Sequence, residues 1–153
     1  MYFEEFEIGQ VVEHPFSRTV SEMDNTLFSC LTLNTQPLHL SEHFSQGTQH
    51  GQRIVNSLFT LGLMVGMSVT TLTLGTTLGN LSMTDIEFPR PVFHGDTLRA
   101  ETRILDKRES RSKPDRGTVT FQDSAYNQHG ELVARCTRVG MMLKRPSNES
   151  GNT

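Results

Sequence analysis

Cysteine is scarce in this chain. Only two are present, Cys30 in a helical-looking stretch and Cys136 within a strand pattern, and neither belongs to a C-x-x-C pair. Disulfide scaffolds are rich in cysteine, and many zinc or redox sites use C-x-x-C pairs. We therefore predict two reduced thiols that are both buried in the core.

A hydrophobic run long enough to cross a membrane is also lacking. The apolar stretch 54–69 is interrupted by polar residues such as Asn56 and Thr60, and it falls short of the ~20 residues that span a bilayer. The first residues, M-Y-F-E-E-F-E, are acidic where a secretory signal carries positive charge before an apolar run. The sequence thus predicts a buried helix at 54–69 and a cytoplasmic protein.

Positive charge is not in excess. The formal net charge is -3 at pH 7, so the chain has no field that would gather nucleic acid. Neither a G-x-G-x-x-G nor a G-K-[ST] phosphate loop is present. We expect no nucleic-acid partner and no separate cofactor.

The first third of the chain alternates between strand and helix signals. Alternation favours a strand over residues 10–20, and Ser21 offers the N-cap of a helix that runs to Leu31. The segment N-T-Q-P ends that helix, because proline disfavours helix in the residue before it. We expect a loop that carries His39, followed by a short helix capped by Ser41.

The apolar stretch 54–69 has helical spacing, but apolar residues cover most of its circumference. Such a helix must be wrapped on nearly all sides. Gly62 and Gly66 lie four residues apart and leave one strip without side chains. We expect the sheet to approach the helix along that strip.

Long alternating segments dominate the remainder. They lie at 97–110, 118–127 and 131–143, with turn sequences between them. One early helix followed by a meander of long antiparallel strands indicates an α+β fold. The chain length fits one domain, which we place at residues 1–146, with a disordered tail at 147–153.

Three segments resemble the MaoC-like dehydratase family. They read Y-F-E-E-F-E-I-G-Q at the start, N-T-Q-P-L-H-L after the first helix, and F-P-R-P-V-F-H-G-D-T-L before the long strands. The resemblance implies a hotdog fold, in which a curled antiparallel sheet wraps around a long central helix. It also implies an acyl-coenzyme A substrate and a homodimer with its active site at the subunit interface.

The N-T-Q-P-L-H segment resembles the family's hydratase signature D-x-N-P-x-H, in which an aspartate and a histidine hold the water that adds to an enoyl thioester. His39 and Pro37 stand at the histidine and proline positions, whereas Asn34 replaces the aspartate and Gln36 the asparagine. The resemblance implies that His39 supplies acid and base in turn, with Gln36 and Pro37 in substrate binding. The alternative for His39 is a structural role, satisfied by backbone groups.

Asn34 is the main departure from the signature. An amide orients water but does not accept a proton as a carboxylate does, so Asn34 is expected to position water or substrate. The alternative is an Asx turn that holds the loop. This variant of the loop resembles mesaconyl-CoA hydratase and related branched-acid dehydratases.

A second departure lies at the start of the long helix, where the family often reads I-V-H-G and this chain reads I-V-N-S. A backbone amide at a helix N-terminus still polarises a thioester carbonyl oxygen. Ser57 is the candidate for this oxyanion contact, and Asn56 a candidate for substrate binding.

Three further groups of charged or ionisable residues have a functional and a structural interpretation. Arg108 and Arg111 belong to a basic cluster at a predicted turn, which either meets coenzyme A phosphates or is simply solvated. His39 and His43 lie four residues apart, but no third ligand is in sight, so we expect no metal. Residues 94–96, His-Gly-Asp, are expected to form the bend that leads into a strand.

The resulting hypothesis is a hydro-lyase that adds water reversibly to a 2-enoyl-CoA, either a simple one or a branched or dicarboxylic one. A thioesterase is the first alternative, but it needs a carboxylate near the start of the long helix, and none lies between Arg53 and Thr70. The second alternative is a catalytically silent subunit that binds acyl-CoA, suggested by Asn34 in the aspartate position.

Overall fold

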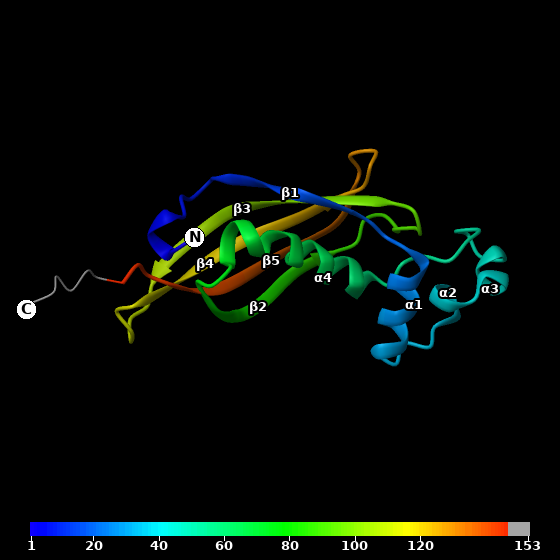
Figure 1. Ribbon diagram of the computed structural model, residues 1–153, viewed down its shortest axis with the longest axis horizontal. Helices are drawn as coiled ribbons and strands as arrows, with labels where there is room; N and C mark the ends of the chain where they lie inside the picture. Colours follow the sequence, from blue (N-terminus) through cyan, green and yellow to red (C-terminus); the bar gives the residue numbers. More distant parts are fainter. Residues whose placement is uncertain (147–153) are drawn as a thin grey trace, which may run out of the picture.

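The computed structural model describes residues 1–146, and the predicted tail at 147–153 lies outside them. Five strands form one antiparallel sheet in the order β1-β3-β4-β5-β2, and helix α4 packs against one face of it (Figure 1). The strands are β1 Val11–Thr19, β2 Thr77–Glu87, β3 Thr97–Glu109, β4 Arg116–Tyr126 and β5 Leu132–Leu143. This is the predicted α+β arrangement, a curved sheet with a long helix.

The helices fall into two groups. The three helices that precede α4 gather at one end of the molecule, beyond the N-terminus of α4 (Figure 1). Their bounds are α1 Glu22–Leu31, α2 Pro37–Leu40 and α3 Glu42–Gln46, while α4 is Ser57–Ser68, continued by a π-helical turn η2 at Val69–Thr73, and a 3-10 turn η1 lies at Phe3–Glu5. Within residues 1–146, no helix is both long and apolar enough to cross a membrane.

Strand β2 was not predicted from the sequence. It is an edge strand, and its register against β5 shifts at three places. Each shift breaks the alternation of inward and outward side chains by which a strand is recognised. Leu78 and Leu81 on this edge strand are exposed in the single chain.

The prediction for the glycine strip of α4 is wrong. A Cβ atom built on Gly62 or Gly66 meets nothing within 4 Å, so the strip does not face the sheet. The sheet packs against Leu61, Met64 and Met67 instead. In one chain, α4 is therefore covered on one side only.

Helix α1 also differs from the expected pattern. Its Ser21 cap is confirmed, since the Oγ accepts a hydrogen bond from Asp24 N. However, the helix buries Asn25 and Ser29 and exposes its apolar outer face. Cys30 lies on that face and is exposed, which corrects the prediction of two buried thiols; only Cys136 is buried.

A row of polar side chains crosses the inner face of the sheet and divides the core. Thr102, Asp123 and Arg138 are buried on the adjacent strands β3, β4 and β5. On each of these strands, the row lies between residues of two separate hydrophobic clusters. Arg138 Nε donates to Asp123 Oδ2 at 2.6 Å and Thr102 Oγ1 donates to Asp123 Oδ1 at 2.5 Å, so the buried charges are paired.

Candidate functional site

The segment that contains Asn34 leaves α1 through a tight turn. Leu33 has a φ of 57°, in the left-handed region that side chains rarely adopt, and Asn34 N donates to Ser29 O at 2.9 Å. The Asn34 Oδ1 accepts a hydrogen bond from Gln36 N at 3.2 Å, which makes an Asx turn. The Asx turn that was the alternative role for Asn34 is thus present. Its Nδ2 group still has two protons with which to orient water or substrate.

The predicted loop around His39 is a one-turn helix, α2, which corrects the sequence analysis. Gln36 precedes it, Pro37 occupies its first position, and Ser41 N donates back to Pro37 O at 2.8 Å. Proline suits the first position of a helix, because its φ is already helical and its missing N–H has no partner there in any case. The proline therefore starts the helix that carries His39.

The His39 ring is held by a backbone group. His39 is 9% exposed, and its Nδ1 lies 2.9 Å from Ile54 O. A carbonyl oxygen only accepts hydrogen bonds, so Nδ1 carries the proton. In the neutral ring Nε2 then has the free lone pair that a general base needs.

Asn25 joins His39 to the start of α4, and its role was not predicted from the sequence. Its side chain is fully buried, and its Nδ2 lies 3.2 Å from His39 O and 3.1 Å from Ile54 O. Its Oδ1 accepts from Asn56 N at 2.9 Å. The sequence did contain one indication. Asn25 lies four positions before Ser29, so the two polar residues share one face of a helix whose other faces are more apolar.

The N-terminus of α4 presents an open backbone donor. Asn56 caps the helix, since its Oδ1 accepts from Leu58 N at 3.1 Å, and its Nδ2 donates to Ser29 Oγ at 3.3 Å. Ser57 is the first helical residue, and its N–H donates to no described residue. A free N–H at a helix N-terminus is suited to a developing negative charge on oxygen.

A pocket of about 200 Å³ lies beside Ser57. Its wall is mostly apolar, with Arg90 and His50 as the basic groups; the remaining lining residues are Ile54, Val55, Thr60, Phe88, Pro91, Val92 and Val133. Arg90 Nη1 lies 3.4 Å from Glu131 Oε1, and its side chain is 58% exposed. Neither Asn34 nor His39 lines this pocket, although Ile54, whose carbonyl holds His39, does.

Arg108 and Arg111 lie far from this pocket. Arg108 lies near the end of β3 and Arg111 in the turn that follows it, at the edge of the molecule that holds the N-terminus, opposite the end with α1, α2 and α3 (Figure 1). Arg108 Nε donates to Asp106 Oδ2 at 2.7 Å and is largely exposed. Within one chain both arginines therefore lie at the opposite end of the molecule from His39, and their contact with coenzyme A phosphates stays a prediction.

The bend at 94–96 forms as expected and adds one contact to the site. Gly95 has a φ of 93°, and Asp96 Oδ2 accepts from Phe93 N at 2.8 Å. His94 Nε2 lies 2.9 Å from Asn25 Nδ2. Burial lowers the pKa of His94 below its ordinary value, and the positive charge of Arg53 lowers it further.

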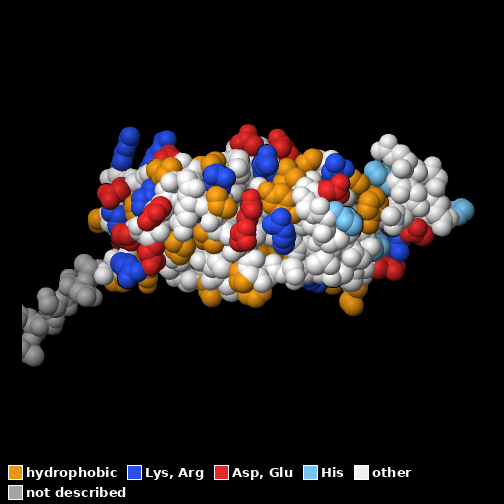
Figure 2. Space-filling view, turned by 90° about the horizontal axis from the view of Figure 1, so that it is seen from above, with side chains coloured by type: hydrophobic (Ala, Val, Ile, Leu, Met, Phe, Trp, Pro, Cys, Tyr) orange, Lys and Arg blue, Asp and Glu red, His pale blue; other side chains and the backbone are white. Residues whose placement is uncertain are grey.

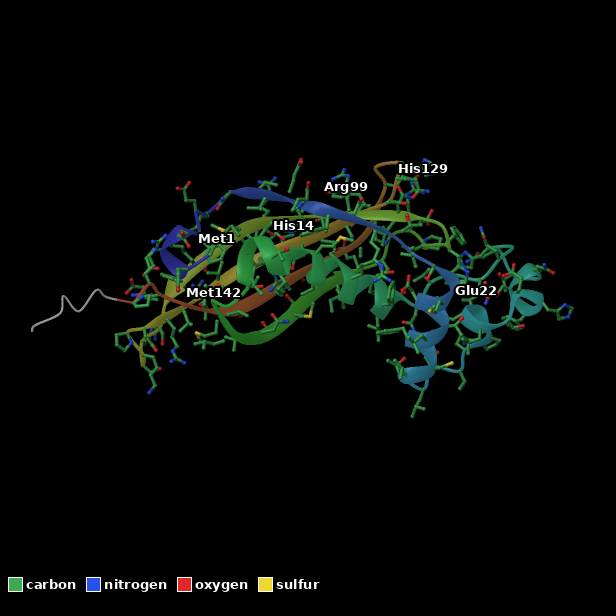
Figure 3. All side chains as sticks on the ribbon, viewed as in Figure 1. Met1, His14, Glu22, Arg99, His129 and Met142 are labelled. Atoms are coloured by element: carbon green, nitrogen blue, oxygen red, sulfur yellow. The ribbon has the colours of Figure 1, made fainter. Side chains whose placement is uncertain are left out.

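Charge is mixed over the rest of this end. Arg53 Nη2 donates to Glu22 at 2.7 Å and its Nε donates to Glu42 at 3.1 Å. Figure 2 shows acidic and basic side chains interspersed on one face, with histidines toward the end that carries the short helices. Glu22 is labelled at this end in Figure 3. The site therefore combines a buried histidine, amides and one helix N-terminus.

Comparison with known families agrees with this geometry. The model of the MaoC like domain matches residues 4–126, which include the His39 helix, the N-terminus of α4 and most of the sheet. The chain belongs to this family. The matched region leaves out β5, whose residues complete the inner face of the sheet in this MaoC-like chain.

Individual relatives and solved structures show which MaoC-like proteins this chain is similar to. It is 31% identical over 144 residues to a mesaconyl-CoA hydratase from Cereibacter sphaeroides, which covers 94% of the chain but 41% of the relative. The MaoC-like dehydratase from Rhodospirillum rubrum superimposes with a TM-score of 0.82 at 27% identity, covering 95% of this chain and 99% of that one. The chain thus spans about two fifths of the length of the first relative.

A solved structure also bears on the predicted hotdog fold. A protein from Mycobacterium tuberculosis that is described as having a double hotdog fold superimposes with a TM-score of 0.85. The identity is 21%, with 99% of this chain and 46% of that chain covered. The MaoC-like chain therefore has the predicted hotdog fold.

Proposed function

We propose that this chain adds water reversibly to the double bond of a 2-enoyl-CoA thioester. The observation that carries the proposal is the buried His39, whose Nδ1 is 2.9 Å from Ile54 O, within the segment that resembles the family's hydratase signature. That contact leaves Nε2 as the basic nitrogen. The names of relatives, such as the mesaconyl-CoA hydratase, support the same chemistry.

The reaction uses His39 twice. Its Nε2 takes a proton from water while the water oxygen bonds to C3 of the enoyl group, and the electron pair of the double bond moves toward the thioester carbonyl. The N–H of Ser57 and the N-terminus of α4 stabilise the resulting enolate oxygen. Protonated His39 then returns the proton to C2, which restores the thioester. Asn34, with Gln36 beside it, orients the water.

The acyl group is proposed to be short and to carry a second carboxylate. A pocket of about 200 Å³ is small, below the range of roughly 300–1,000 Å³ that is usual for drug-sized ligands. Arg90 and His50 are the basic groups among its lining residues. A guanidinium binds a carboxylate well. To bind one in the substrate, Arg90 would need to break only its long, 3.4 Å contact with Glu131.

The proposed partner is a second copy of the hotdog domain. The edge strand β2 leaves backbone donors and acceptors unpaired, and an exposed edge is a site for strand pairing. Leu58 at the start of α4, together with Leu78 and Leu81 of β2, is exposed in the single chain. A two-fold pair that joins the β2 edges would cover these side chains and place Ser57 near the interface.

Two alternatives have less support. A thioesterase needs a carboxylate near the start of α4, and the pocket beside Ser57 has none among its lining residues. A silent acyl-CoA-binding subunit remains consistent with Asn34, but it gives no reason for the fixed tautomer of His39. A cytoplasmic location fits the proposal, because both cysteines are free thiols.

The test is the loss of enoyl-thioester absorbance with crotonyl-CoA and mesaconyl-CoA. The expected result is loss without release of free thiol, reduced at least 10²-fold in His39→Ala. The matched control is His43→Ala, which removes an exposed histidine from the neighbouring helix α3 and is expected to keep full activity. Release of free thiol would instead establish a thioesterase, and binding without conversion would establish a silent subunit.

A further inference from the structure

The side chain of Asn25 lies at the centre of hydrogen bonds that join four segments. Asn25 is fully buried in α1. Its Nδ2 lies 3.2 Å from His39 O, 3.1 Å from Ile54 O and 2.9 Å from His94 Nε2, and its Oδ1 lies 2.9 Å from Asn56 N. One amide therefore links α1, α2, the residues before α4 and the bend at 94–96.

The neighbours of Asn25 fix which way its amide points. The carbonyl oxygens of His39 and Ile54 only accept, and the N–H of Asn56 only donates, so Nδ2 must face the former and Oδ1 the latter. Nδ2 then also faces His94 Nε2, which must accept. His94 is consequently neutral, with its own proton on Nδ1, and the two protons of Nδ2 are shared among three acceptors.

Resting on the function proposed above, we propose that Asn25 is a positioning residue for the hydration, and that it requires His94 in the neutral form. Ile54 O accepts from both Asn25 Nδ2 and His39 Nδ1. Asn25 thus holds the acceptor that keeps the His39 proton on Nδ1 and leaves Nε2 free. Through Asn56, the same amide holds the N-terminus of α4, which carries the oxyanion donor.

Burial is the main reason that His94 stays neutral, because it lowers the pKa of the ring below its ordinary value. The positive charge of Arg53 lowers this pKa further, whereas Glu22 of α1 and Glu42 of α3 raise it. Both carboxylates are already paired with the Arg53 guanidinium, and burial acts against the charged ring. On its own bend, Asp96 is occupied by Phe93 N and the side chain of Gln128.

The first experiment reads the His39 tautomer directly, without substrate, from the ¹⁵N chemical shifts of its imidazole nitrogens. In the wild type we expect a protonated Nδ1 and an unprotonated Nε2. Asn25→Asp keeps the volume but offers no N–H to Ile54 O, so the two His39 tautomers should mix and His94 should titrate at higher pH. Asn25→Leu should mix the His39 tautomers as well, without the added charge.

Asn127→Leu is the matched control for lost stability. Asn127 is a buried asparagine whose Oδ1 accepts from His129 N and Glu131 N and whose Nδ2 donates to Glu131, all in the turn between β4 and β5. Its replacement should lower stability and leave the His39 shifts unchanged. Unchanged shifts in a folded Asn25→Asp protein would overturn the positioning role.

The second experiment measures hydration of crotonyl-CoA. For Asn25→Leu and Asn25→Asp we expect kcat to fall about 10²-fold, as for a catalytic group displaced by about 1 Å, with KM changed far less. His94→Gln offers a side-chain oxygen that accepts without titrating, so it should keep kcat and weaken the acid limb of the pH profile. His94→Leu has no acceptor and should lose kcat.

The two experiments separate this inference from the proposed function. Absence of hydration in the wild type, with His39 shifts that still depend on Asn25, would reject the function and keep the positioning role. Full kcat in both Asn25 variants would reject the positioning role and keep the function.

Discussion

At the residue scale, side chains of the same type take their roles from local contacts that a sequence does not display. Asn34 stands in the aspartate position of the signature, yet its oxygen is used in an Asx turn. Asn25 has no signature at all, yet it contacts both halves of the site. Resemblance led to His39, Asn34 and Ser57 because they lie in or near known motifs, whereas a buried amide within a helix is visible only after folding.

Arg90 is the residue that we expect to select the acyl group. It is a basic residue at the pocket beside Ser57, and within residues 1–146 its one ion pair is with Glu131. Arg90→Gln should lower kcat/KM for mesaconyl-CoA about 10-fold or more, as expected for loss of a charge-assisted hydrogen bond worth about 1.5–3 kcal/mol. The same change should leave kcat/KM for crotonyl-CoA, which has no second carboxylate, nearly unaltered.

Arg103→Gln provides the control for the net charge, because Arg103 is an exposed arginine on β3 outside the pocket. Equal losses on both substrates in Arg90→Gln would show that Arg90 contacts the coenzyme A portion or supports the fold, and would contradict the assignment of a dicarboxylic acyl group.

At the element scale, regular periodicity was predictable and interrupted periodicity was not. Each of the four predicted strands lies within two residues of its predicted bounds. Alternation is long and largely regular in β3, β4 and β5, whereas β1 has one register shift, between Glu13 and Ser17. Strand β2 escaped recognition because its register shifts repeatedly. The side of α4 that faces the sheet was also not predictable, since a helix that is apolar all round gives no direction.

Strand β2 is expected to form the interface between two copies. Leu81→Lys places a charge on the exposed edge, which disfavours strand pairing and should convert the dimer into a monomer. Leu31→Lys is the matched control, because Leu31 is even more exposed but lies on α1. Sedimentation velocity should show a dimer for the wild type and Leu31→Lys, and a monomer for Leu81→Lys. A dimeric Leu81→Lys protein would place the interface elsewhere.

At the scale of the whole molecule, the sheet combines two hydrophobic clusters with a buried polar row, and this division was not foreseen. His14 of β1 belongs to the row and lies over the middle of the sheet (Figure 3). Its Nε2 is 2.9 Å from Thr102 Oγ1, and its Nδ1 is 2.7 Å from Thr71 Oγ1. The hotdog fold could be predicted because the three motifs that carry the resemblance are spread from residue 2 to residue 98 and are followed by long alternating segments. The polar row could not, because its members come from four strands that only folding aligns.

The polar row makes stability depend on pH through His14. Burial lowers the pKa of His14 below its ordinary value of 6.5, with Asp123 opposing and Arg138 reinforcing the shift. The unfolded chain therefore binds a proton first as the pH falls, so the free energy of unfolding decreases below about pH 6.5 and stops decreasing once the folded state is protonated as well. One proton contributes at most about 1.4 kcal/mol per pH unit.

Urea unfolding of the wild type and His14→Gln between about pH 7 and 5 measures this contribution. Glutamine retains an N–H for Thr102 but does not titrate, so the decline should be shallower in the variant. The pKa of His94 is lowered as well, but His94 contributes equally in both proteins. The difference between their curves of unfolding free energy against pH therefore isolates His14. Parallel curves would mean that the folded protein takes up the proton at His14 as readily as the unfolded chain, and that the buried row is open to water.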